Sequence, residues 1–186
     1  DIFRIFDALN DNRNLRVAIE AVKEAGRHAQ GAICYSTGPV YDVQRFVAQA
    51  QELETMGCDS ICIKDMAGLL TPWASADLVK GLREAVSVPL HLHCHATAGL
   101  AELCQMKAIE AGCLQIDTAC SSLSGGTSHP PTESMVAALK ESPYDTGLDL
   151  GALQAIGFYF REVRKKYWAY ESEFTGVDTR VQLNQV

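Results

Sequence analysis

The feature of this sequence that most constrains its fold is a strand–helix unit that repeats along the chain. Five short apolar or β-branched runs are each followed by a segment whose apolar residues recur at helical spacing. The mid-strand residues Ile33, Ile63 and His93 follow one another at intervals of 30 residues. This spacing, with no hairpin signal between the runs, is typical of parallel βα units.

The expected strands and helices alternate along the chain. Polar residues end almost every expected strand, as on the active rim of a barrel, and no GxGxxG motif follows the first strand. We therefore expect an α/β protein of the TIM (β/α)8 barrel class and not an open doubly wound sheet. The expected strands are residues 2–8, 31–36, 60–64, 90–95 and 114–118, and the expected helices are about 14–28, 43–56, 74–86, 100–111, 133–141 and 153–168.

The length of the chain limits how much of such a barrel it forms. A complete (β/α)8 barrel takes about 250 residues, whereas this chain has 186 and begins within an apolar run. We expect a partial barrel whose N-terminal strands are missing. Residues 1–148 would supply its βα units, and residues 149–186 would form the start of a C-terminal helical region.

Composition excludes some classes of partner. The 16 basic and 23 acidic residues give a net charge of -7, which argues against a surface that binds nucleic acid or anionic membranes. No apolar run approaches the roughly 20 residues that span a bilayer. The seven cysteines are odd in number and form no CxxC pair, so we expect reduced thiols and a cytoplasmic location.

Three residues at strand ends could take part in chemistry. His93 and His95 alternate on one expected strand, so both imidazoles point to the same side, where they could bind a metal. Lys64 ends the preceding strand, where desolvation favours a neutral amine that could form a Schiff base, act as a general base or react with CO2 to give a carbamate. The alternatives are hydrogen-bonded core histidines, and an ion pair of Lys64 with Asp7 or Asp65.

A segment rich in glycine and proline, residues 124–133, follows the last expected strand. Its glycines let the backbone approach a ligand closely, and Pro130 and Pro131 stiffen the entry into the next helix. The segment could therefore bind a ligand, or its end at Thr132, Glu133 and Ser134 could simply cap the next helix.

Four stretches of the chain together resemble the carboxyltransferase domain of biotin-dependent enzymes. That family includes pyruvate carboxylase, the transcarboxylase 5S subunit and the oxaloacetate decarboxylase α subunit, and the PPTESMV ending is most similar to the last of these. The resemblance covers essentially the whole chain and implies a barrel. The stretches are FRIFDALN at residues 3–10, IKDMAGLL at 63–70, HLHCHATAG at 91–99 and GTSHPPTESMV at 126–136.

The resemblance implies a role for each candidate residue. Lys64 is expected to be carboxylated and to bridge to a divalent metal, which would be zinc, manganese or cobalt, with His93 and His95 as further ligands. Thr127 is expected to contact biotin and to relay a proton between the biotin ureido nitrogen and the enol of pyruvate. The implied activity moves CO2 between oxaloacetate, or pyruvate, and biotin, as in an oxaloacetate decarboxylase.

The resemblance also implies partners. The sequence holds no MKM-type site for biotin attachment, so biotin would be carried on another domain or subunit. We expect a homo-oligomer within a decarboxylase or carboxylase complex, in contact with a membrane only through partner subunits. The family's RDAHQS-type motif, which carries an aspartate ligand and a substrate arginine, is not in this sequence, and neither is its PGGM-type segment.

Two other hypotheses stay open. One is a metal-dependent aldolase or lyase barrel of the isopropylmalate synthase or HMG-CoA lyase type, which also uses an HxH pair. Lys64 in its KDMAGLL context favours the carboxyltransferase over this alternative. The other hypothesis is a catalytically silent fragment that packs on a partner subunit.

Overall fold

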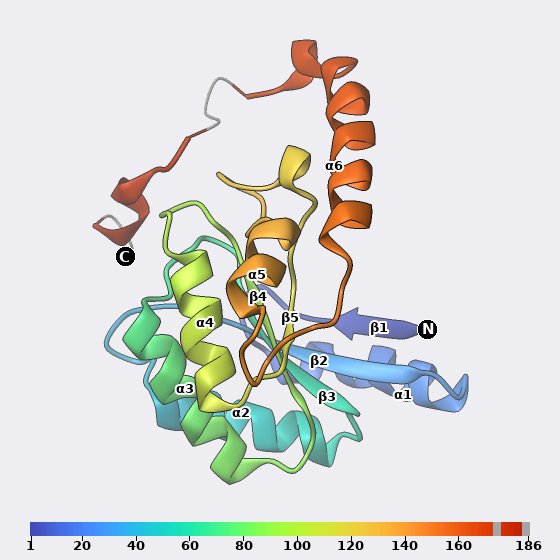
Figure 1. Ribbon diagram of the computed structural model, residues 1–186. Coiled ribbons are helices and arrows are strands. Elements are labelled where there is room, and N and C mark those ends of the chain that lie inside the picture. Colours follow the sequence, from blue (N-terminus) through green and yellow to red (C-terminus); the bar gives the residue numbers. More distant parts are fainter. Residues whose placement is uncertain (173–175, 184–186) are drawn as a thin grey trace.

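The computed structural model describes residues 1–172 and 176–183 (Figure 1). Residues 173–175 and 184–186 lie outside the described residues.

The strands form one parallel sheet whose spatial order follows the order in the sequence. The strands of a barrel wall follow one another in this order, whereas in a doubly wound sheet the strand order reverses at a switch point. The expected partial TIM-barrel-like fold is therefore confirmed. The strands are β1 (Ile2–Ile5), β2 (His28–Cys34), β3 (Ser60–Asp65), β4 (Leu90–Cys94) and β5 (Gln115–Ile116).

The strand bounds differ from the expectation: β1 ends at Ile5 and not at residue 8, β2 is shifted by two to three residues toward the N-terminus, and β5 is much shorter. β2 begins at His28 because α1 ends early, at a turn where Gly26 adopts a left-handed φ of 64°. β5 has two residues because it pairs only through His91 and Leu92 of β4. The backbone N–H of Asp117 still donates to the carbonyl of Leu92 at 3.0 Å, so the next residue of the chain remains held against β4.

Four helices cover one face of the sheet, and two more follow β5 (Figure 1). Side-chain caps fix some of the starts: Asp42 accepts from the N–H of Arg45, and Thr71 from that of Ala74. The α-helices are α1 (Arg16–Glu24), α2 (Val43–Thr55), α3 (Pro72–Ala85), α4 (Ala101–Ala111), α5 (Thr132–Leu139) and α6 (Leu150–Lys165). The 3-10 turns are η1 (Asn12–Asn14), η2 (Ser121–Leu123), η3 (Trp168–Tyr170) and η4 (Thr179–Gln182).

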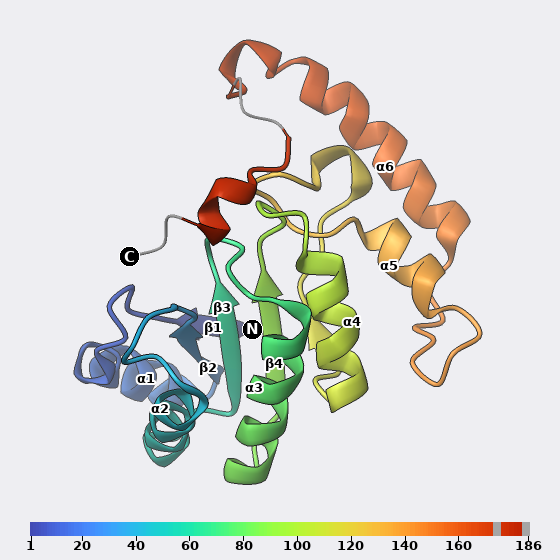
Figure 2. The ribbon, with the colours of Figure 1, turned by 90° about the vertical axis from the view of Figure 1, so that its left-hand side faces the viewer.

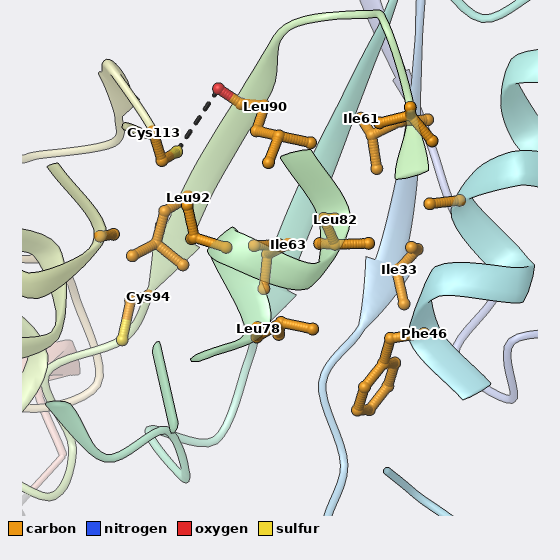
Figure 3. Close-up of a cluster of buried hydrophobic side chains, with 14 of the residues drawn as sticks. Ile33, Phe46, Ile61, Ile63, Leu78, Leu82, Leu90, Leu92, Cys94 and Cys113 are labelled. Carbon is orange, nitrogen blue, oxygen red and sulfur yellow. Dashed lines mark hydrogen bonds between the residues drawn. The ribbon is translucent and has the colours of Figure 1, made fainter. Parts of the chain in front are cut away.

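Alternate residues of each strand face the helices and form the core. Figure 3 shows Ile63 and Leu92 of the sheet beside Leu78 and Leu82 of α3, with Phe46 of α2 next to Ile33. Burial of one such aliphatic side chain contributes about 1.5–3 kcal/mol to folding. The strand residues on this side are Ile5, Ala29, Ile33, Ile61, Ile63, Leu90, Leu92 and Cys94.

The other face of the sheet is polar, because the intervening residues of the strands carry hydrogen-bonding side chains. The strand registers place them side by side: Arg4 lies opposite Gln30, Gln30 opposite Ser60, and Lys64 opposite His93. This face would line the interior of a complete barrel. The candidate site residues therefore extend from one continuous polar surface.

Helix α6 begins at Leu150, with the Asp149 carboxylate accepting from the N–H of Gly151 at 2.7 Å. It packs on α5 and η2, and its only buried residue is Gly157, where an added Cβ would lie 2.7 Å from Oε1 of Glu133. The division of the chain into units at residues 148 and 149 stays a prediction.

The expected cap of α5 is not present. Pro131 occupies the N-cap position and makes no side-chain cap, and the Thr132 hydroxyl instead pairs with that of Thr118 at 2.8 Å. The carboxylate of Glu133, one residue into the helix, accepts from the N–H and the hydroxyl of Ser121. Segment 124–133 is thus tied to η2 by side chains from the start of α5.

The segment around η4 crosses the rim of the sheet (Figure 2). The N–H of Asp178 donates to the carbonyl of Thr97 at 2.8 Å, and the Gln182 amide donates to the carbonyl of Gly68 at 2.8 Å. This segment therefore joins the loops that follow β3 and β4.

All seven cysteines are free in the structure, and six of them are buried. Across residues 1–172 and 176–183, none of the helices has the length and apolar character that crossing a bilayer requires.

Candidate metal centre

The end of β4 carries the expected histidine pair. Nε2 of His93 and Nε2 of His95 are 3.1 Å apart, and Lys64 lies opposite His93 on the neighbouring strand. Two nitrogens at this separation can both reach one ion at the usual zinc–nitrogen distance of about 2.0–2.1 Å. The structure therefore brings together the residues that the sequence indicated, at the carboxyl end of the sheet.

The Nδ1 atoms of the pair are both held by oxygen acceptors. Nδ1 of His93 lies 2.6 Å from Oδ2 of Asp117, and Nδ1 of His95 lies 2.6 Å from the carbonyl oxygen of Thr127. Because these oxygens can only accept, each Nδ1 carries the proton and each Nε2 presents a lone pair. Carboxylate and carbonyl partners of this kind orient metal-binding histidines.

The electrostatics of the pair suit a cation. Burial lowers the pKa of both His93 and His95, and nearby cationic groups, Lys64 among them, lower it further. Both rings are therefore neutral at pH 7, and two lone pairs face one another across 3.1 Å. A positive ion between the nitrogens relieves that repulsion, so the donor set fits a divalent metal.

Asp117 is the centre of an ionic network that the sequence did not reveal. Its carboxylate accepts from His91 and His93 at 2.6 Å and from Arg4 at 2.5 Å. Burial acts to raise the pKa of Asp117, but these hydrogen bonds outweigh it and hold the pKa well below its usual range. The group therefore stays a carboxylate and fixes the tautomer of His93.

Arg4 of β1 closes this network on the far side. Its Nε donates to the Gln30 amide oxygen at 2.6 Å, and the Gln30 nitrogen donates to the Ser60 hydroxyl at 3.0 Å. Arg4 and Asp117 are about three-quarters buried, which strengthens their charge-assisted pairing. The position of His93 on β4 is thereby linked to β1, β2, β3 and the residue that follows β5.

Lys64 is half-buried at the rim, with Nζ 4.8 Å from the centre of the Phe6 ring. Within the described parts of the chain it pairs with neither Asp7 nor Asp65, so the alternative of a rim ion pair is not observed. The Asp7 carboxylate instead accepts from the N–H groups of Leu9 and Asp11. Lys64 thus remains available for the expected ligand role.

The residues that follow Lys64 hold the turn after β3 in place. The fully buried Asp65 carboxylate accepts from the N–H groups of Leu69 and Leu70, both at 2.9 Å. Gly68 has a φ of +71°, and a Cβ there would lie 3.0 Å from the carbonyl oxygen of His95. The aspartate and glycine of the KDMAGLL stretch therefore fix the loop against the histidine strand.

Thr127 lies where the loop after β5 meets a cavity. Its carbonyl holds His95, and its exposed side chain stands at a cavity of about 470 Å³ between this loop and α6. Phe160, Val163 and Tyr167 of the α6 region line the opposite wall. Among the described residues the Thr127 hydroxyl makes no hydrogen bond, so the contact with the histidines is made by its backbone.

A third histidine was missed in the sequence. The His129 ring centre lies 4.3 Å from that of His93 and 4.6 Å from that of His95, and the three rings offer nitrogens that all lie within 4.8 Å of one another. Its position in the loop that follows a strand, next to two prolines, was the available signal, since barrel chemistry collects in such loops.

The sequential parallel sheet and the histidine pair at its carboxyl rim define the class of this protein. The chain matches the HMGL-like family over residues 7–158 and belongs to that family.

Comparison with individual proteins narrows the class to the carboxyltransferase domains that the motifs resemble. The chain is 54% identical over its whole length to a pyruvate carboxylase subunit of Methanocaldococcus jannaschii, covering 33% of that protein. It is 46% identical over its whole length to the methylmalonyl-CoA carboxyltransferase 5S subunit of Propionibacterium freudenreichii subsp. shermanii, covering 37% of it. The chain thus spans about a third of the length of these curated relatives.

A solved structure agrees with these relatives. The carboxyl transferase domain of Rhizobium etli pyruvate carboxylase, determined with pyruvate and biocytin, superimposes with a TM-score of 0.96 at 42% identity. The match covers 98% of this chain and 32% of that one. The resemblance found in the sequence is therefore confirmed.

Proposed function

We propose that this chain is part of a biotin-dependent carboxyltransferase that moves CO2 between oxaloacetate, or pyruvate, and biotin. The observation that carries the proposal is the facing pair of Nε2 atoms on His93 and His95, 3.1 Å apart and beside Lys64. It occurs in a chain that matches a carboxyl transferase domain determined with pyruvate and biocytin. The oxaloacetate decarboxylase type, indicated by the PPTESMV ending, belongs to the same proposal.

We assign the metal to His93 and His95, with Lys64 as a further ligand after carboxylation. Zinc, manganese and cobalt fit these donors. When bound, the metal would supply positive charge close to the enolate oxygen that develops on the keto acid. Asp117 and the Thr127 carbonyl hold the two imidazoles in the tautomer that leaves Nε2 free.

The transfer requires a balanced exchange of CO2 and a proton. The nitrogen–carbon bond of carboxybiotin breaks, a carbon–carbon bond forms at the methyl carbon of pyruvate, and the proton lost from that carbon ends on the biotin nitrogen. We assign the relay of this proton to the Thr127 hydroxyl, since a hydroxyl can donate and accept in one step. Its place at the cavity beside α6 is compatible with an approaching biotin.

The substitution that tests this relay is Thr127→Ala, with Thr127→Ser as its matched control. Because the contact of Thr127 with His95 is made by its backbone carbonyl, both variants should keep metal binding. Thr127→Ala should lose biotin-dependent turnover and Thr127→Ser should retain most of it. Full turnover in Thr127→Ala would remove the relay role.

The function is tested with the full-length protein by measuring pyruvate formed from oxaloacetate with and without free biotin. Biotin should stimulate the reaction, a chelator should abolish it, and zinc, manganese or cobalt should restore it. His93→Ala should be inactive. His28→Gln, which alters a histidine that pairs with Ser60 on the same sheet face, should be active. Undiminished biotin-dependent turnover in His93→Ala would contradict the proposal.

Membership of the HMGL-like family also supports an aldolase or lyase as a second candidate, because the family match covers the histidine pair. Cleavage of a 3-hydroxy-3-methylglutaryl thioester without any biotin-dependent transfer would favour it. A biotin carrier domain and other complex subunits are the partners we propose, and homo-oligomerisation, cytoplasmic location and membrane contact through partners stay predictions.

A further inference from the structure

Three histidines meet at the carboxyl end of β4: His93 is on the strand, His95 directly follows it, and His129 is on a distant loop. The ring centres of His93 and His95 are 5.0 Å apart, and that of His129 lies within 4.6 Å of each. One nitrogen of each ring lies within 4.8 Å of the other two. Among the described residues these three form the one group of histidine, cysteine and acidic side chains with this arrangement.

His129 is oriented in the same way as the pair. Its Nδ1 lies 3.0 Å from the carbonyl oxygen of Cys94, the residue between His93 and His95. A carbonyl can only accept, so Nδ1 of His129 donates to it, and Nε2 is the nitrogen of this ring that is left to bind an ion. All three rings therefore have a protonated Nδ1 bonded to oxygen and an Nε2 available to bind an ion.

The loop that carries His129 is held in place by its backbone. The N–H of Ala96 donates to the carbonyl of Ser128 at 2.7 Å, and the N–H of Gly125 donates to the carbonyl of His129 at 2.9 Å. On the other side Pro130 accepts from the N–H of Ala119 at 3.0 Å. The third imidazole is thus positioned before any ion arrives, which lowers the cost of ordering it on binding.

We propose that His129 is a third protein ligand of the metal centre, together with His93 and His95. This inference rests on the metal centre of the proposed function and extends it with a residue that the sequence motifs did not assign. Three imidazole nitrogens favour zinc, cobalt and other late first-row divalent ions over magnesium or calcium, which prefer oxygen ligands. The side chains of this chain alone would therefore make the site selective for a transition metal.

Cobalt binding to the metal-free full-length protein tests this assignment without any assay of turnover. We expect His129→Gln to weaken the dissociation constant for Co²⁺ at least tenfold and to change the visible absorption of the bound ion, because one nitrogen donor is lost. His28→Gln is the matched control, since it makes the same substitution on the inner sheet face, and it should bind as the unaltered protein does. Binding within twofold and an unchanged spectrum in His129→Gln would overturn the inference while leaving the proposed function intact.

A second measurement does not depend on how the variant folds. X-ray absorption at the zinc edge of the unaltered zinc-loaded protein should show scattering from three imidazoles. Two imidazoles would overturn the role of His129 and keep the pair. An unaltered protein that binds neither zinc nor cobalt would overturn this inference and the metal centre of the proposed function together.

Discussion

The carboxylate of Asp117 lies 2.6 Å from Nδ1 of His93, and this contact decides which nitrogen of the imidazole is free. The two residues are on neighbouring segments of the sheet, because Asp117 directly follows β5 and His93 is on β4. Arg4 holds the same carboxylate from β1. The orientation of a candidate ligand thus depends on a charge network that spans the sheet.

Replacing Asp117 with asparagine should weaken metal binding without abolishing it. An amide can present a donor where His93 needs an acceptor, so the ring loses its fixed tautomer. We expect the dissociation constant for zinc to rise about 10- to 100-fold, measured by competition with a chromogenic chelator. Asp77→Asn, on the exposed side of α3, is the control. Equal zinc affinity in the two variants would show that Asp117 does not orient the ligand.

Lys64 should carry a carbamate in the protein as it is isolated with its metal. Intact mass measured under conditions that preserve the adduct should exceed the sequence mass by about 44 Da, the mass of CO2 added to an amine. Lys64→Ala should remove both the added mass and most of the bound metal. A full metal content in Lys64→Ala would rule out Lys64 as a ligand.

Removing the Asp65 carboxylate should lower the free energy of unfolding. In Asp65→Ala the buried N–H groups of Leu69 and Leu70 lose their acceptor. Two unsatisfied buried donors cost about 2–5 kcal/mol of unfolding free energy, measurable by urea denaturation. Asp77→Ala should change it by less than about 0.5 kcal/mol. Similar losses in both variants would contradict the role of Asp65.

Glu54 should make stability depend on pH in the acid range. Its carboxylate accepts from the N–H and hydroxyl of Ser87 and from the N–H of Val88, and these hydrogen bonds lower the pKa of Glu54. A lowered folded-state pKa adds stability that is present above the unfolded-state pKa, near 4.3, and that is lost as the pH falls through the folded-state value.

The comparison is between the unaltered protein and Glu54→Gln across pH 3 to 7. The unaltered protein should unfold at a higher temperature than Glu54→Gln at pH 7, and the difference should shrink below about pH 4. Glu24→Gln, on an exposed position of α1, serves as the control. A difference that stays constant with pH would show that the charge of Glu54 makes no contribution.

The βα repeat predicted the fold because hydrophobic period and strand spacing are local properties. His93 and His95 were found for the same reason: two residues that alternate on one strand must share a face. The partners of these histidines could not be predicted, since Arg4 and Asp117 are 113 residues apart and meet only through strand order. The sequence shows Asp117 as a polar residue at the end of an expected strand. That its carboxylate accepts hydrogen bonds from His91, His93 and Arg4 depends on tertiary contacts.

The loop after β5 shows the same limit. Its glycines and prolines predicted a special backbone, and the cap expected from Thr132 was wrong because that hydroxyl pairs with Thr118 instead. His129 was part of the matched stretch, yet its closeness to His93 and His95 arises from the backbone pairing of Ser128 with Ala96.

Above all, we expect this chain to bind a transition metal through the end of β4. Anomalous diffraction from crystals of the full-length protein, recorded on both sides of the zinc absorption edge, tests this binding most directly. We predict one strong peak within bonding distance of Nε2 of His93 and Nε2 of His95, with the modified Lys64 beside it. An anomalous map with no peak between these two nitrogens, from protein grown with excess zinc, would contradict it.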